Sequence, residues 1–169
     1  MNYFEIFELP ISLHIHQTDL KNKFYFLSRK YHPDFFVQEN ETEKDAALEM
    51  SSQLNKAYKI FQQPEETIKY VLQLKGLLEE EEKYQLSPDF LMEMMELNEN
   101  LEDAKFNSDV AFINKSKQAI NTLEEEIYLP VKSIIVGFVD GVTATSDLLK
   151  VKEYYFKKKY LKRILATMQ

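Results

Sequence analysis

Residues 20–34 read LKNKFYFLSRKYHPD, and this stretch decides the fold of the N-terminal part of the chain. Its apolar side chains recur at intervals of three or four residues and so form one stripe along a helix: Leu20, Phe24, Leu27 and Tyr31. Thr18 is the expected N-cap, which places the helix at about Asp19–Tyr31. The helix should end at His32-Pro33-Asp34, because a residue that precedes proline is disfavoured in the α region.

A second amphipathic helix is expected to follow, from about Glu41 to Phe61, after a polar loop. One of its faces is apolar: Ala47, Met50, Leu54, Ala57 and Phe61. Two such helices joined by a short loop can pack antiparallel, with His32-Pro33-Asp34 at the tip of the hairpin. Pro64 then opens a shorter helix, about Glu65–Leu74, and Gly76 suits the position just after its end.

The acidic run LLEEEEK at residues 77–83 indicates a domain boundary, since clustered like charges favour a solvated connection. Three longer helices are expected beyond it: about Pro88–Phe106, Asp109–Val139, which Pro130 should break or kink, and Ser146–Thr167. The sequence therefore predicts an all-α protein with a helical hairpin domain at 1–76, a linker at 77–87 and a three-helix bundle at 88–169.

The amino-acid composition limits the possible folds, partners and compartments of the protein. The chain has 169 residues, a formal net charge of −7, and only three glycines and five prolines, which disfavours turn-rich sandwiches and barrels. An acidic chain repels nucleic acid and anionic lipid, so neither is an expected partner. No cysteine is present, and the sequence shows neither a signal peptide nor a long apolar span. We expect a cytoplasmic protein.

Motifs for catalysis are not found. The glycines form no phosphate-binding loop, and no serine lies in a nucleophile elbow. His14 and His16 could ligate a metal only with a third ligand from elsewhere, so two surface histidines are the expected outcome. His32 and Asp34 lie across a proline with no nucleophile nearby. The sequence predicts no enzyme activity, cofactor or metal site.

The tripeptide His32-Pro33-Asp34 allows two interpretations. It can be a polar turn between helices. It can also be a compact docking point for a charged partner, because a rigid proline holds an imidazole and a carboxylate beside a locally basic helix. That helix carries the cations Lys21, Lys23, Arg29 and Lys30 in a chain that is acidic overall.

Residues 20–34 resemble the second helix and HPD loop of J-domains, and Leu54-Asn55-Lys56-Ala57-Tyr58 resembles a segment of their third helix. Other segments resemble the HscB-type co-chaperones of iron–sulfur cluster assembly: residues 2–10, 70–76 and 88–93. The resemblance covers almost the whole chain. This sequence differs from common J-domain patterns at Tyr25, Phe26, Phe35 and Thr67-Ile68, where the first three stand at positions that are often basic.

The resemblance implies that the protein docks on a DnaK-type (HscA-like) ATPase chaperone and stimulates its ATP hydrolysis. His32, Pro33 and Asp34 match the motif on which that activity depends, and the partner hydrolyses the nucleotide.

The first helix of the expected bundle carries two apolar faces. At about 100° per residue, one stripe should face the bundle: Phe90, Met94, Leu97 and Leu101. The opposite side collects methionines and acids, with Leu91 at its edge: Met92, Met95, Glu96, Glu99 and Asp103. Exposed methionines with an acidic rim suit a protein-binding patch, unless another element covers this face.

Family resemblance implies that this patch binds an IscU-type iron–sulfur scaffold protein. It assigns that role to Leu91, Met92, Met95, Glu96, Glu99 and Asp103 and, by a looser alignment, to Tyr155 on the last helix. Two other interpretations remain open. The protein can be a J-domain co-chaperone for a different client, or a helical protein that self-associates through Met92 and Met95.

Overall fold

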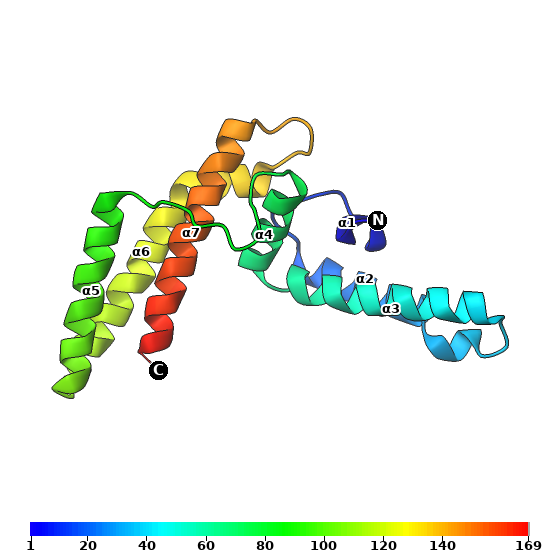
Figure 1. Cartoon of the computed structure of the whole chain (residues 1–169), viewed down its shortest axis with the longest axis horizontal. Coiled ribbons are helices and arrows are strands. Elements are labelled where there is room, and N and C mark those ends of the chain that lie inside the picture. The colour runs from blue at the N-terminus through cyan, green and yellow to red at the C-terminus, as the bar shows by residue number, and fades with distance from the viewer. Residues whose placement is uncertain (169) are drawn as a thin grey trace. The chain divides into compact units, whose positions relative to one another are not determined.

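The computed structural model describes residues 1–168, and every regular element in this range is helical (Figure 1). The elements are α1 (Tyr3–Ile6), α2 (Gln17–Lys30), the 3₁₀ helix η1 (Pro33–Phe36), α3 (Glu41–Phe61), α4 (Pro64–Leu74), α5 (Pro88–Phe106), α6 (Val110–Gly137) and α7 (Thr145–Thr167). The predicted all-α class is confirmed.

The chain forms two compact units. The first comprises Met1–Lys75 together with Ile135–Thr143, and the second comprises Gly76–Ile134 together with the chain from Ala144 onward. Lys75 forms an ion pair with Asp140 and so fastens the returning segment to the end of α4 within the first unit. Nothing in the local sequence pattern indicates this return of the chain.

In the first unit, α2 and α3 lie side by side as an antiparallel pair (Figure 1). The Gln17 side chain at the start of α2 donates a hydrogen bond to the Phe61 carbonyl at the end of α3, at 3.0 Å. Leu20 and Leu27 of the predicted stripe are buried against the core side chains of α3. The hairpin is therefore held along its length by apolar packing and at its base by a hydrogen bond.

The base of the hairpin carries an aromatic cluster. Phe4 and Phe7 pack against Phe61 with ring centroids 4.6 and 5.6 Å apart. Asn2 and Glu5 form a capping box that starts the short helix α1. The Tyr3 N–H donates to the Tyr70 hydroxyl at 2.9 Å, which connects α1 to α4.

The structure corrects the expected start of the first long helix. His16, and not Thr18, is the N-cap of α2, and it makes no side-chain capping hydrogen bond. The hydrogen bond from Gln17 to α3 holds the additional residues in place, so a tertiary contact overrides the local capping signal. By contrast, α3 has the expected bounds, and Gly76 adopts a positive φ of 68° after α4.

The second unit contains α5, α7 and most of α6. Its core joins buried side chains from all three helices: Phe90, Met94, Leu101, Ile120, Leu161, Ile164 and Met168. Pro130 does not end α6, which continues to Gly137. The segment 134–136 is helical as expected.

The acidic run before α5 is not wholly solvated. Glu82 Oε2 lies 2.8 Å from the Lys152 ammonium of α7, and both side chains are largely buried. This ion pair attaches the segment to the bundle, because a partner charge offsets the loss of hydration. Among residues 1–168, no helix is long and apolar enough to cross a membrane.

Candidate functional site

The loop at the tip of the hairpin is a preformed turn. His32 has extended backbone angles and is the N-cap of η1, and Pro33 occupies the first position of that helix. The Asp34 N–H donates to His32 Nδ1 at 3.3 Å, and the Phe35 N–H donates to the His32 carbonyl at 3.0 Å. These contacts fix the turn without using the imidazole Nε2 or the Asp34 carboxylate to close it.

Both chemical groups of the turn face solvent. The side chain of His32 is 51% exposed and that of Asp34 is 85% exposed, with Nδ1 and Oδ2 3.6 Å apart. The two helices that carry the turn pack on each other, and η1 also packs on α3. A partner therefore meets an imidazole and a carboxylate in a fixed arrangement, which suits charge-assisted hydrogen bonding.

The four predicted basic residues do not act as one surface. The Lys23 ammonium donates to the backbone carbonyls of Phe7 and Glu8, at 3.2 and 2.7 Å. Lys23 is thus engaged in holding the end of α1, contrary to the expectation of a free docking cation. Sequence pattern cannot show this, because the acceptor carbonyls lie 15 and 16 residues away.

The other three cations are more available. The Lys30 ammonium lies 4.0 Å from a Glu8 carboxylate oxygen, at the limit of an ion pair. The Lys21 ammonium lies 5.9 Å from the Tyr25 ring centroid. Arg29 is exposed and has no carboxylate partner among residues 1–168.

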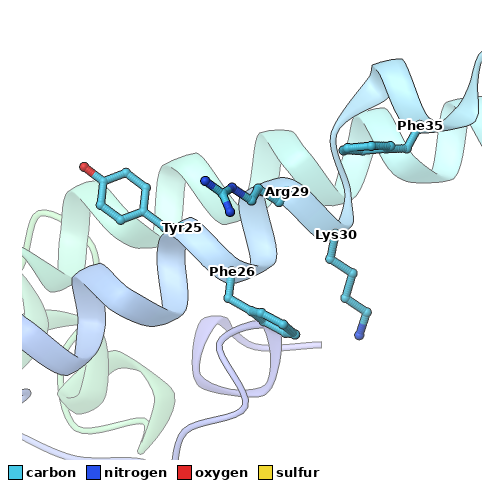
Figure 2. A pocket seen from close by; sticks show the side chains of 5 residues that line it. All are labelled: Tyr25, Phe26, Arg29, Lys30 and Phe35. Carbon is cyan, nitrogen blue, oxygen red and sulfur yellow. The ribbon is translucent and has the colours of Figure 1, made fainter.

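Exposed aromatic side chains lie beside the turn. Figure 2 shows Tyr25 and Phe26 projecting from α2, with Arg29 and Lys30 one turn further along and Phe35 on η1. These five residues line an open hollow of about 880 Å³. The helical spacing indicates that Tyr25 and Phe26 are exposed, because they fall outside the buried stripe of Leu20 and Leu27.

The α5 stripe is confirmed. Phe90, Met94 and Leu101 are buried, and Leu97 packs partly buried against the same core. Met92 and Met95 are 68% and 57% exposed.

The rest of the predicted patch lies on the same exposed side. Glu96, Glu99 and Asp103 are exposed, and Leu91 is half-buried at the edge. Their exposure means that no described element of the second unit, through Met168, covers these methionines and acids. The role of this patch in binding a scaffold stays a prediction.

Tyr155 does not belong to an exposed surface. It is only 6% exposed, because the phase of α7 turns both Tyr154 and Tyr155 inward. Phe156 is half-buried instead and stacks on Tyr84, with ring centroids 4.6 Å apart. Together with Leu91, these two rings help line a hollow of about 320 Å³.

No group of three or more potential metal ligands occurs within residues 1–168. The His14 and His16 rings contact each other edge to face, with centroids 5.4 Å apart.

Comparison with known families divides the chain in two. Residues 2–70 match the DnaJ domain, and residues 86–169 match a domain described as the HSCB C-terminal oligomerisation domain. The first match contains the whole hairpin and the His32–Asp34 turn. The second contains α5 and the exposed methionines.

Individual relatives agree with these matches. The chain is 34% identical to a co-chaperone protein HscB homolog from Vibrio vulnificus, over 75% of this chain and 80% of the relative. It is 32% identical to the mouse iron-sulfur cluster co-chaperone protein HscB, over 96% of this chain. The chain spans 65% of the length of the mouse protein and 64% of that of a Vibrio cholerae homolog.

Solved structures show the same architecture. Human co-chaperone protein HscB superposes with a TM-score of 0.80 and 28% identity, covering 99% of this chain and 80% of the human chain. Chaperone HscB from Vibrio cholerae superposes with a TM-score of 0.75 and 27% identity, covering 99% of this chain and 95% of that one.

Proposed function

This chain belongs to the HscB family of co-chaperones, and we propose that it brings an iron–sulfur scaffold protein to a DnaK-type, HscA-like ATPase chaperone. In this proposal the chaperone hydrolyses ATP and this protein stimulates the hydrolysis. The chain itself supplies contacts and no catalytic group. The cytoplasm remains the proposed compartment.

The observation that carries the proposal is the exposed turn at the hairpin tip. His32, Pro33 and Asp34 are held by η1 and by two packed helices, so their groups are ordered before a partner arrives. A preordered site loses little conformational freedom on binding, and its free energy is then available to favour one state of the partner. We infer that the turn favours the hydrolysis-competent state of the chaperone.

The second contact of the proposal is the α5 patch. Its methionines are adaptable apolar side chains and its carboxylates are exposed, which favours a client face with apolar residues and cations. The mouse relative is an iron-sulfur cluster co-chaperone by name, and we therefore assign an IscU-type scaffold protein to this patch. Phe156 replaces the buried Tyr155 as the α7 aromatic that we assign to this surface.

Simultaneous binding explains why one chain carries both sites. Once the scaffold is held on the bundle and the chaperone on the turn, the encounter of scaffold with chaperone becomes nearly intramolecular. The local concentration of client then depends on this protein and not on diffusion. Neither site needs a metal or nucleotide on this chain.

The experiment measures single-turnover ATP hydrolysis by a purified HscA-like chaperone, with and without scaffold protein. Asp34→Asn keeps the size of the side chain but removes its charge, so we expect loss of stimulation with unchanged helicity and scaffold binding. Asp19→Asn, at the opposite end of α2, is the matched control and should stimulate normally. Full stimulation by Asp34→Asn would refute the proposal.

A second candidate function is self-association through the bundle, because the matched C-terminal family is described as an oligomerisation domain. Met92 is 68% exposed and would be central to such a contact. Sedimentation of the pure protein tests this directly. A stable oligomer that Met92→Glu converts to monomer would favour self-association over client binding.

A further inference from the structure

Exposed apolar side chains surround the His32–Asp34 turn on both sides, and we call them the apolar collar: Tyr25, Phe26, Phe35, Val37 and Leu48. They are 55%, 66%, 71%, 65% and 60% exposed. The first three line the hollow of about 880 Å³ on the α2 side. Val37 and Leu48 line a hollow of about 310 Å³ on the α3 side, together with Pro33 of the turn itself.

The collar adds little to folding of the hairpin. Phe24, next to Tyr25, stacks on Tyr58 of α3 with ring centroids 3.9 Å apart and supplies the aromatic contact between the helices. Phe26 has most of its surface in water. Single exposed apolar residues are common, but a group around one turn indicates an interaction surface.

The collar is continuous with the turn. The Phe35 and His32 rings lie edge to face, with centroids 6.3 Å apart. A macromolecule that contacts the His32 imidazole is then close enough to contact Phe35, which lines the adjoining hollow. This continuity favours a single molecule as the partner of both the collar and the turn.

The charges at the rim argue against a second copy of this chain as that occupant. Arg29 and Lys30 line the hollow beside Phe26, and two copies meeting face to face there would bring like charges together. A partner with carboxylates at the edge of an apolar face would instead pair with these cations.

We propose that the DnaK-type chaperone buries the apolar collar when it contacts the turn, and that this burial supplies most of the docking affinity. This inference rests on the proposed function and specifies its partner. The chaperone must present an apolar surface bordered by carboxylates. Docking should then depend only weakly on salt, since apolar burial is not screened, whereas docking through the basic side chains alone would weaken steeply.

The test titrates the full-length protein against the purified chaperone and measures both the dissociation constant and the maximal ATPase rate. For Phe26→Ala/Phe35→Ala we expect at least about tenfold weaker binding with an unchanged maximal rate, as for anchoring side chains. Arg29→Ala/Lys30→Ala should weaken binding by no more than about threefold, as for exposed ion pairs. Phe106→Ala, which removes another exposed ring (90%) from α5, is the matched control and should bind normally.

The outcomes separate the inference from the proposed function. If Phe26→Ala/Phe35→Ala binds like the unmodified protein while Asp34→Asn no longer stimulates, the collar inference fails and the proposed function stands. If the Arg29/Lys30 variant loses more affinity and salt weakens docking steeply, ion pairs dominate and the inference is overturned. If Asp34→Asn stimulates fully, the proposed function itself fails. An oligomer that Phe26→Ala/Phe35→Ala dissolves would assign the collar to self-association and also overturn the inference.

Discussion

Met94 and Met95 are neighbours on α5 with the same side chain, but they face opposite environments. Met94 is 0% exposed and belongs to the core of the second unit, whereas Met95 is 57% exposed. Replacing each by alanine removes the same atoms from the same helix. The pair therefore isolates burial as the variable.

The expected magnitudes differ severalfold. Truncating a fully buried methionine loses its transfer free energy and leaves a cavity, so Met94→Ala should lower the free energy of unfolding by about 2–5 kcal/mol. Met95→Ala leaves no cavity, and its effect should stay within about 0.5 kcal/mol, as at ordinary surface sites. A loss of about 3 kcal/mol corresponds to a fall in melting temperature of about 6–12 °C for a chain of this size.

Urea titration followed by helical circular dichroism measures both variants against the unmodified protein. A second measurement compares scaffold binding by the triple variant Leu91→Ala/Met92→Ala/Met95→Ala with that by the unmodified protein. We expect at least tenfold weaker binding, about 1.4 kcal/mol, without a matching loss of stability. Equal destabilisation by Met94→Ala and Met95→Ala would show that the supposed patch is packed. A stable triple variant that binds the scaffold normally would place the client elsewhere.

Two further predictions test single contacts. Lys23→Met keeps the aliphatic stem but removes the donor to the Phe7 and Glu8 carbonyls. We therefore expect the free energy of unfolding, measured in urea, to fall by about 1–2 kcal/mol. An unchanged unfolding midpoint would mean that the contact contributes nothing to stability. Burial raises the pKa of the Tyr70 phenol above its ordinary value of about 10. The free energy of unfolding should therefore be undiminished below about pH 10 and fall as the pH rises through the raised pKa, because the unfolded phenol loses its proton first. Tyr70→Phe should reduce this alkaline loss, and an identical pH profile would contradict the assignment.

The bounds of α3 and the buried face of α5 were predictable because they depend on near neighbours. The apolar period of α3 and its flanking polar residues predict Glu41–Phe61, and the structure has that helix. The same reasoning placed Met92 opposite Met94, which burial confirms. A residue's angle about its own helix axis follows from its position in the chain alone.

The exposure of two aromatic residues of α2 could be predicted from the helical period in the same way. Tyr25 and Phe26 lie outside the buried stripe just as Met92 and Met95 do, so their exposure followed from the period. Their grouping with Phe35, Val37 and Leu48 could not be predicted from that period. Those residues come from the 3₁₀ helix, the loop after it and α3, and only the packed hairpin gathers them around one turn.

The sequence alone determined the all-helical architecture, the antiparallel hairpin with its His32–Asp34 tip, and the exposed methionines of α5. The tertiary structure decided which polar groups meet: Lys23 with carbonyls 15 and 16 residues away, and Glu82 with Lys152, which lies 70 residues along the chain. It also decided that Tyr155 is buried whereas Phe156 is only half-buried. Periodicity specifies where a side chain points around its own helix, but the neighbour it meets depends on how separate helices pack against one another.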